Sequence, residues 1–372
     1  MLYNCKRIHY NPGGVLLRMV LSRQVLLFSF ILLLLFLLPL LGGCSDSVNS
    51  GGQQAVPTPY HTPAVLTGLL PTADTAPANQ VVLGFSQLGS ESTWREANTA
   101  SIREAAAEAG ITLLLSNAEQ DQQQQFEAIR SFIKRKVDVI AVAPVVQTGW
   151  EPVLLEIRQA GIPVIIMDRS VNVEDSSLYV TFIGSDFYEE GVKAAKYVID
   201  KLRHQIEPIR IAELQGTVGS TPSIDRGRGF RKLIEERPNL EITMSAPADF
   251  TQSGGREVMR TFLQQPEEKW PRVLFSHNDD MAIGAVEAIR EAGLVPGKDI
   301  IIVSVDGTRR AFEQMAAGNI NAVVECNPLL GPLLMQAVAE IMAGRTLPKR
   351  MVTPEDIYTQ ELAALEVDNR KY

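Results

Sequence analysis

The sequence has little of what disulfide-stabilised domains, nucleic-acid-binding proteins and most enzymes depend on. Basic residues are outnumbered, with 35 Lys and Arg against 43 Asp and Glu, which argues against a nucleic-acid partner because such proteins need a basic face. No Gly-x-Gly-x-x-Gly or P-loop pattern follows a predicted strand. The four histidines (His9, His61, His204 and His277) are scattered along the chain. We therefore expect no catalytic centre, no bound metal and no cofactor.

Cysteine is also scarce, with three in 372 residues. Cys5 and Cys44 lie in the N-terminal region, and Cys326 stands alone in an apolar stretch. No disulfide framework can be built from this set, so we expect Cys326 to be a buried free thiol.

The first 44 residues have the pattern of an export signal. Basic residues from Lys6 to Arg23 precede an apolar run over residues 25–41. The run ends at Leu41-Gly42-Gly43-Cys44, which resembles a bacterial lipobox, in which cleavage leaves a lipidated Cys44 as the mature N-terminus. An uncleaved transmembrane helix is the alternative, since the run approaches about 18 residues, although Pro39 interrupts it. We expect an exported protein held by lipid in the periplasm or on the outer face of the cytoplasmic membrane.

Residues 45–79 form the next segment. They are rich in Ser, Gly, Gln, Pro, Thr and Ala and show no apolar period, which predicts a flexible tether between the lipid and a folded domain.

From Val81 onward, short apolar runs alternate with amphipathic stretches that often stop at glycine, as at Gly110. This rhythm predicts strands at 81–85, 111–115, 137–143, 162–167, 209–214, 241–245, 273–276, 300–305 and 322–324. It predicts helices at 93–109, 122–134, 151–160, 187–203, 224–236, 254–264, 281–292 and 309–317. Continuous apolar strands between amphipathic helices indicate parallel sheets covered on both faces. The sequence therefore predicts an α/β fold of two doubly wound parallel-sheet lobes with a cleft between them, where ligands bind beyond the carboxyl ends of the strands.

Polar and charged residues recur where predicted strands end, and together they suit a sugar. Hydroxyl groups both donate and accept hydrogen bonds, so carboxylates, amides and guanidinium groups match them, while an aromatic side chain covers the apolar face of the ring. The candidate ligand contacts are Trp94, Arg95, Asp168, Arg169, Arg226, Asn278, Asp306 and Glu325, with Glu91 and Asp225 as further candidates.

Each of these candidates also has a purely structural alternative. Trp94 could belong to the core, and Asp168 could pair with the arginine that follows it. Asp225 could cap a helix, Asp306 could form an Asx turn before a glycine, and Glu325 could be a hinge residue without a ligand role.

Over residues 80–360 the sequence resembles the periplasmic sugar-binding proteins of the ribose type, and within them the galactofuranose-binding members that serve ABC importers. The runs that carry the resemblance include Gly84-Phe85-Ser86-Gln87, Trp94-Arg95, Thr148-Gly149-Trp150-Glu151-Pro152, Asp168-Arg169-Ser170, Glu213-Leu214-Gln215-Gly216-Thr217, Asp225-Arg226 and His277-Asn278-Asp279-Asp280-Met281. The resemblance implies a monomeric type I periplasmic binding protein, not an enzyme, that captures galactofuranose or a related furanose and delivers it to ABC permease subunits. It assigns ring stacking to Trp94 and a polar hinge position to Glu325.

The same resemblance implies a hinge of three strands, with crossings near Ser185, Glu325 and Thr353. The N-terminal lobe would then comprise 80–185 plus 326–353, and the C-terminal lobe 186–325 plus 354–372.

Two other roles share this core. A transcription regulator would need a basic helix-turn-helix before residue 80, where the export signal and tether lie instead. A surface receptor that presents the sugar to a sensor kinase or chemoreceptor would need no change in the core, so this role remains the alternative to import.

Overall fold

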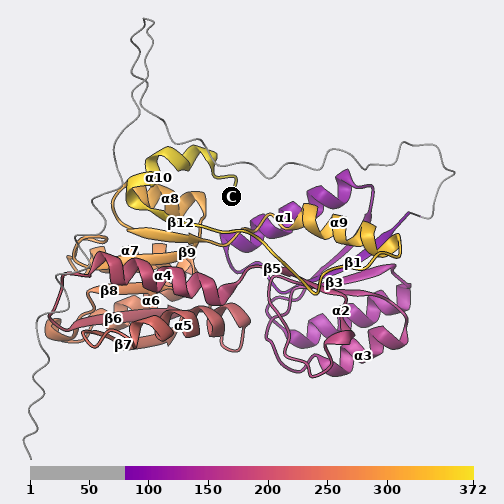
Figure 1. Cartoon of the computed structure of the whole chain (residues 1–372), viewed down its shortest axis with the longest axis horizontal. Coiled ribbons are helices and arrows are strands. Elements are labelled where there is room, and N and C mark those ends of the chain that lie inside the picture. The colour runs from indigo at the N-terminus through magenta and orange to yellow at the C-terminus, as the bar shows by residue number, and fades with distance from the viewer. Residues whose placement is uncertain (1–79) are drawn as a thin grey trace, which may run out of the picture. The chain divides into compact units, whose positions relative to one another are not determined.

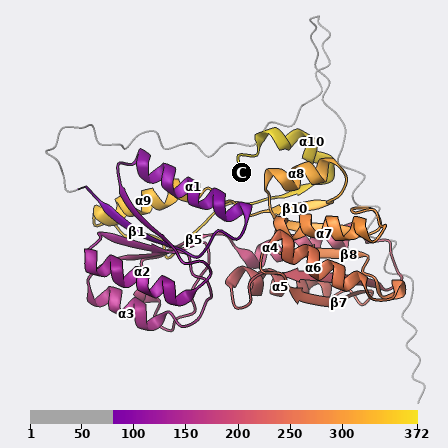
Figure 2. The same cartoon turned by 180° about the vertical axis from the view of Figure 1, so that it is seen from behind.

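The computed structural model of the chain describes residues 80–372. The export signal, the lipobox at Cys44 and the tether, which we predicted over residues 1–44 and 45–79, lie outside the described residues. Two six-stranded sheets form the framework of two lobes, which Figures 1 and 2 show from opposite sides. The predicted α/β class with two doubly wound lobes is therefore confirmed.

The first sheet has the strand order β11-β5-β4-β3-β1-β2, and all of its pairings are parallel. Its strands are β1 (Val82–Gln87), β2 (Thr112–Asn117), β3 (Val139–Val142), β4 (Val164–Met167), β5 (Thr181–Gly184) and β11 (Arg350–Val352). Helices α1 (Thr93–Glu108) and α9 (Gly331–Met342) cover one face, while α2 (Gln122–Arg135) and α3 (Glu151–Gln159) cover the other.

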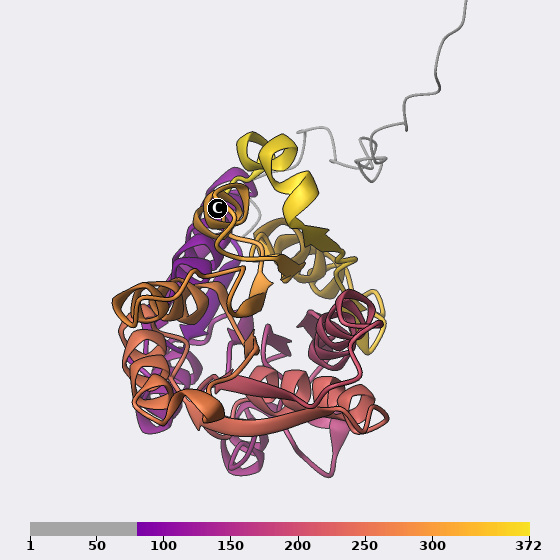
Figure 3. The same ribbon diagram turned by 90° about the vertical axis from the view of Figure 1, so that its left-hand side faces the viewer.

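The second sheet repeats this plan with the order β12-β10-β9-β8-β6-β7. Its strands are β6 (Ile209–Gln215), β7 (Leu240–Pro247), β8 (Val273–Ser276), β9 (Ile301–Asp306), β10 (Ala322–Glu325) and β12 (Ile357–Thr359), of which only β12 is antiparallel to its neighbour. Helices α4 (Phe187–Lys201) and α5 (Thr221–Ile234) cover one face. Four helices lie on the other face: α6 (Gln252–Leu263), α7 (Asp279–Glu291), α8 (Arg309–Ala316) and α10 (Gln360–Glu366). In Figure 3 the orange α6 and α7 therefore lie across the strands from the dark red α4.

The chain passes between the two sheets three times. The first passage joins β5 to α4 at Ser185, the second joins β10 to α9 through Cys326, and the third joins β11 to β12 over residues 353–356. Because β11 pairs with β5 and β12 pairs with β10, the last part of the chain contributes one strand to each lobe.

Several elements escaped the sequence pattern. The pattern did not assign the short strands β5, β11 and β12, and it did not assign the helices α9 and α10. Helix α9 buries a strongly apolar surface against the first sheet and α1, so its sequence lacks the polar stripe of an amphipathic helix. None of the helices within residues 80–372 combines the length and apolarity needed to cross a bilayer.

Glycine permits the close packing of α4 on α5 in the second lobe. A side chain at Gly191 would meet the main-chain oxygen of Arg226, and one at Gly229 would meet the main-chain oxygen of Tyr188. This contact fixes the helix that carries Arg226, so the two glycines also fix the position of that side chain.

We expect Gly191→Ala to lower the free energy of unfolding by about 2 kcal/mol or more, because the added methyl group forces two backbones apart. Urea denaturation followed by circular dichroism measures the change. Lys196→Ala, on an exposed position of the same helix, is the control and should change stability by less than about 0.5 kcal/mol. Equal stabilities of the two variants would contradict the close packing.

Candidate ligand-binding site

The carboxyl ends of both sheets border one narrow pocket, which we call the cavity. The residues that line it come from both lobes: Glu91, Ser92, Trp94, Arg95, Asp168, Arg169, Phe187, Pro222, Arg226, Phe250, Asn278, Asp306 and Cys326.

Hydrogen bonds between the lobes close the rim of this cavity. The main-chain N–H and the hydroxyl of Thr93 both donate to Asp280 Oδ2 at 2.9 Å. On the far side, Ser170 N–H donates to Thr221 Oγ1 at 3.1 Å, and the main chain of Gln147 donates to that of Gly219 at 3.0 Å. The structure therefore describes the lobes in contact, with the site shielded from water.

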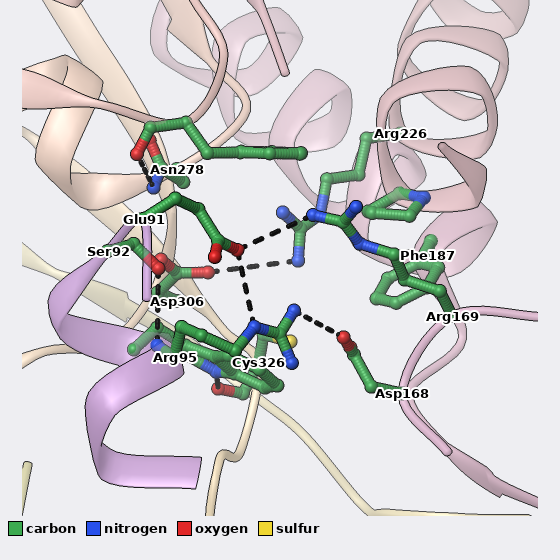
Figure 4. A pocket seen from close by; sticks show the side chains of 13 residues that line it. Glu91, Ser92, Arg95, Asp168, Arg169, Phe187, Arg226, Asn278, Asp306 and Cys326 are labelled. Carbon is green, nitrogen blue, oxygen red and sulfur yellow. Dashed lines mark hydrogen bonds and ion pairs between the residues drawn. The ribbon is translucent and has the colours of Figure 1, made fainter. Parts of the chain in front are cut away.

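Three guanidinium groups converge inside the cavity (Figure 4). Arg95 contacts Asp168 Oδ2 at 2.5 Å and Glu91 Oε1 at 3.2 Å, and the same Glu91 oxygen lies 3.6 Å from Arg169 Nη2. Burial acts against ionisation of Glu91, but the two arginines outweigh it and lower the pKa of the carboxyl group. Burial lowers the pKa of Arg169 to about 10, so this arginine still carries its charge at neutral pH.

The second lobe supplies the third guanidinium group, that of Arg226. Its Nε donates to Glu190 Oε2 at 2.6 Å, its Nη1 donates to the main-chain oxygen of His277 at 2.6 Å, and its Nη2 lies 3.8 Å from Asp306 Oδ1. Burial opposes the charge on Arg226, yet the Glu190 carboxylate raises the pKa of the guanidinium above its ordinary value. Burial raises the pKa of Asp306 well above its ordinary value and favours the neutral acid.

The charges of the site are therefore close to balance. Three guanidinium groups face the carboxylates of Glu91 and Asp168 and, behind the wall, that of Glu190, while burial favours the neutral form of Asp306. Such a balance suits a neutral ligand with many hydroxyl groups better than an anion or a cation.

Several buried polar atoms of the site have no hydrogen-bond partner among the described residues. These atoms are Arg95 Nη1, Arg169 Nε and Asp306 Oδ2. An unmatched buried polar atom costs about 1–3 kcal/mol, so a ligand that supplies partners gains affinity from each. Two of the atoms donate, and the Asp306 oxygen accepts or, as the neutral acid, donates.

Aromatic rings cover the guanidinium groups. Arg95 lies 4.7 Å from the ring centroid of Trp94, Arg169 lies 5.4 Å from that of Phe250, and Arg226 lies 5.0 Å from that of Phe187. Cation–π contact of this kind stabilises a desolvated guanidinium and fixes its plane. The Trp94 indole N–H also donates to the main-chain oxygen of Cys326 at 2.6 Å, so a side chain of α1 reaches into the core of the second lobe.

Two aspartates of the site occupy left-handed backbone conformations at strand ends. Asp168 follows β4 with φ of 58°, and Asp306 ends β9 with φ of 130°. Such strain in a residue other than glycine persists only where surrounding contacts compensate for it, and it is typical of functional sites. The Asp279 carboxylate provides one compensation, since it accepts hydrogen bonds from the main-chain N–H groups of Gly307 and Thr308.

The structure brings most of the predicted site residues together, and it places two of them elsewhere. Those that line the cavity are Glu91, Trp94, Arg95, Asp168, Arg169, Arg226, Asn278 and Asp306. Glu325 does not line it, because its carboxylate is held by Arg370 Nη1 at 2.7 Å and lies near the Tyr372 hydroxyl. Asp225 does not line it either, because it projects from α5 toward Arg228, 3.1 Å away.

Asn278 lines the cavity and also caps a helix, a second role that we did not predict from the sequence. Its Oδ1 accepts from the main-chain N–H of Met281 at 3.0 Å and so caps α7, while Nδ2 donates to the main-chain oxygen of Phe250 at 3.0 Å.

Sequence reasoning missed the apolar part of the wall. Phe187 follows β5, Phe250 follows β7, and Ser92, Pro222 and Cys326 complete the set. Phe187 and Phe250 could have been found from their position shortly after a strand, which is the signal that identified the polar residues.

Cys326 has the structural role that we predicted for it, and His277 is buried as well. Cys326 is a buried free thiol, and burial raises its pKa well above the ordinary value. His277 is buried, with Nε2 3.0 Å from Glu213 Oε1, and burial lowers its pKa. Neither has the environment of an activated nucleophile or general base.

Comparisons with known proteins agree with this geometry. The family model described as "Periplasmic binding protein domain" matches residues 83–346. The chain is 41% identical over 296 residues to the galactofuranose-binding protein YtfQ of Escherichia coli K12, a match that covers 79% of this chain and 92% of that protein.

Two similar solved structures hold furanose sugars. One, from Mycobacterium smegmatis in complex with β-D-fucofuranose, has a TM-score of 0.76 and 49% identity, covering 78% of this chain and 95% of that one. The other is the periplasmic component of the arabinose ABC transporter of Shewanella sp. ANA-3, bound to α- and β-L-arabinofuranose. It has a TM-score of 0.76 and 46% identity, covering 78% of this chain and 96% of that one.

We expect Glu190→Ala to lower the free energy of unfolding by about 3 kcal/mol, because it leaves the buried Arg226 guanidinium without its nearest carboxylate. Urea denaturation at pH 7 measures the loss. Glu189→Ala, at the neighbouring exposed position, is the control and should be close to neutral. Similar stabilities of the two variants would show that the Arg226–Glu190 pair does not hold the wall of the cavity.

Proposed function

Because the chain belongs to the periplasmic binding protein family, we propose that it captures one neutral monosaccharide between its lobes and delivers it to the membrane subunits of an ABC importer. The observation that carries this proposal is the cavity itself, where the guanidinium groups of Arg95, Arg169 and Arg226 meet carboxylates and leave buried polar atoms unmatched.

The pattern of unmatched atoms supports a polyhydroxylated ligand. A sugar hydroxyl accepts from Arg95 Nη1 or Arg169 Nε and donates its own proton to a carboxylate oxygen such as that of Glu91. Hydrogen bonds that involve charged groups are shorter and stronger than neutral ones, so a few of them within a dry cavity support tight binding. The aromatic residues Trp94, Phe187 and Phe250 supply the apolar part of the wall, which suits the C–H groups of the ring.

The sugar we propose is a furanose, with galactofuranose or a close relative of it as the leading candidate. YtfQ is named for galactofuranose, and the two solved structures hold fucofuranose and arabinofuranose. The closed rim, where Thr93 donates to Asp280 and Ser170 donates to Thr221, favours a monosaccharide over an oligosaccharide.

We propose capture without chemical conversion. The acids of the cavity are engaged with guanidinium groups or, at Asp306, held in a setting that favours the neutral form, which suits binding rather than proton transfer to a substrate. Release then needs only the parting of the lobes, which breaks the hydrogen bonds of Thr93 and Ser170 at the rim.

The place of action we propose is outside the cytoplasmic membrane. A monomer tethered by a lipid on Cys44, with residues 45–79 as the spacer, remains near the permease and still turns freely to meet it. These features rest on the sequence, since that part of the chain lies outside the described residues.

We expect Arg169→Ala to weaken binding of L-arabinose or D-galactose, each supplied as the equilibrium mixture that includes its furanose form, by more than tenfold. The substitution removes a charged donor and leaves Glu91 with one arginine in place of two. Isothermal titration calorimetry measures the affinity, and circular dichroism checks that the variant is folded. Arg130→Ala, which removes an exposed arginine paired with Glu156, is the matched control and should bind as the native chain does.

A panel that sets methyl furanosides against methyl pyranosides, which do not interconvert, tests the choice of ring. Tight binding of pyranosides with no response to furanosides would remove the furanose assignment. Unchanged affinity in Arg169→Ala would remove that side chain from the site.

We expect Cys44→Ser to move the exported protein from the membrane fraction to the soluble fraction, since the lipid is the anchor we assign to the chain. Cell fractionation with immunoblotting in a bacterial host that processes lipoproteins measures the shift. A Cys44→Ser protein that stays with the membrane would indicate an uncleaved apolar helix in place of the lipid.

A further inference from the structure

The three segments that pass between the lobes meet at one carboxyl group, that of Glu355. Its Oε1 accepts hydrogen bonds from Ser185 Oγ at 2.5 Å, Asn327 N–H at 3.0 Å and Thr353 Oγ1 at 2.8 Å. Ser185 lies on the first passage, Asn327 on the second, and Thr353 with Glu355 on the third. A single oxygen atom therefore ties together the whole hinge.

The charged and titratable groups that face Glu355 come from α4, α5 and the second passage. Helix α4 contributes the Glu190 carboxylate and Lys193, whose Nζ donates to the main-chain oxygen of Glu355. The second passage contributes the Cys326 thiol, which lies 3.3 Å from Ser185 Oγ. Helix α5 contributes Arg226, whose Nε donates to Glu190 Oε2.

This cluster is continuous with the ligand cavity. The Cys326 thiol group and the Arg226 guanidinium both line the cavity, and Glu190 joins Arg226 to the neighbourhood of Glu355. A change of charge at Glu355 therefore acts on the Arg226–Glu190 ion pair, which borders the ligand cavity. A change in the angle between the lobes, in turn, alters the surroundings of Glu355.

We propose that Glu355 is a positioning residue that holds the three passages in the closed arrangement, and that a proton bound there stabilises closure and so tightens ligand binding. The inference rests on the proposed function, since it concerns the hinge that closes over the ligand. Within residues 80–372 the ligand atoms of Glu190, Cys326 and Glu355 also lie within 4.8 Å of one another, a spacing that a metal ion could bridge. A proton is favoured over a divalent metal ion because Arg226 and Lys193 already bring two positive groups to the cluster, and a divalent ion adds twice the charge of a proton.

The direction of the pH dependence follows from the surroundings of Glu355. Burial and the Glu190 carboxylate raise its pKa to about 8 in this arrangement. When the lobes part and water reaches the hinge, we expect the pKa to fall toward its ordinary value near 4.5. The closed state then binds the proton more tightly, so the contribution to closure is complete below the open-state pKa and is lost as the pH rises through about 8.

Other groups titrate in the cavity and behind its wall, and the comparison of variants separates them from Glu355. Asp306 and Asp279 both have raised pKa values because of burial, so the native profile alone assigns nothing. Glu355→Gln keeps the acceptor oxygen and is neutral at every pH, and it therefore removes the contribution of Glu355 alone. Glu236→Gln, at an exposed position of the second lobe, is the matched control.

The experiment is calorimetric titration of L-arabinose and D-galactose into the native chain, Glu355→Gln and Glu236→Gln at pH 6, 7, 8 and 9. Titrations at pH 7 in buffers of different ionisation enthalpy give the number of protons taken up on binding. We expect the native Kd to rise by roughly tenfold or more from pH 6 to pH 9 relative to that of Glu355→Gln. We also expect native binding to take up a larger fraction of a proton at pH 7 than binding by Glu355→Gln.

A ratio of the two Kd values that does not change with pH would overturn the proposal, as would a native profile that shifts when a chelator is added.

A second measurement needs no sugar and so separates failure of this inference from failure of the proposed function. Cys326 lies at the hinge, and its rate of alkylation by N-ethylmaleimide, read from its own peptide by mass spectrometry, reports opening. At a single pH we expect Glu355→Ala, which removes the tie among the three passages, to react at least tenfold faster than the native chain, with Glu355→Gln in between. Equal rates in all three proteins would refute the role of Glu355 in the hinge, whereas absence of sugar binding with unequal rates would refute only the proposed ligand.

Discussion

Three guanidinium groups can be buried beside one another only if carboxylates are buried with them, and this constraint organises the cavity and its walls. Arg95, Arg169 and Arg226 are each at most 3% exposed, a degree of burial that would be prohibitive for unpaired charges. Glu91, in the loop just before α1, serves two of them, and Glu190 serves the third from α4. In the closed arrangement these carboxylates hold the guanidinium groups in place, so that each presents its remaining N–H groups to the ligand away from bulk water.

The same constraint explains why the site needs both lobes. The first lobe supplies Arg95 and Arg169 with their acids, but the ring beside Arg169 is that of Phe250 in the second lobe. Trp94 belongs to α1, yet its ring lies in the apolar core of the second lobe and its N–H donates to Cys326 at the hinge. Parting of the lobes would remove these rings from the guanidinium groups and admit water, which lowers the value of each polar contact to a bound sugar. Affinity and closure are therefore two aspects of one desolvation step.

The sequence could predict the parts of this site that depend on local pattern. Parallel strands bring their carboxyl ends to one edge, and so the residues after β4 and β9 were identified from their position alone. Phe187 escaped because β5 was not among the predicted strands, so no strand end was expected before it. Phe250 escaped because the edge strand β7 runs to Pro247, beyond the segment that its apolar pattern predicted. Glu325 was misplaced because its partner is Arg370, 45 residues away in the chain, and no local pattern reveals such a pairing.

Contacts with the C-terminal segment also show how the second lobe holds its strained strand end. The Arg370 guanidinium lies between the rings of Phe312 and Tyr358, 4.1 and 4.2 Å from their centroids, while it binds Glu325 beside Asp306. On the opposite side, the Asp279 carboxylate fixes the turn that follows Asp306. The left-handed backbone of Asp306 is thus clamped from two sides by groups that never touch the cavity. Asp306 presents one carboxyl oxygen to Arg226 and leaves the other unmatched. Because these contacts fix the backbone of Asp306, they determine which of its oxygens faces a ligand. The geometry of the site is therefore set in part by residues behind it.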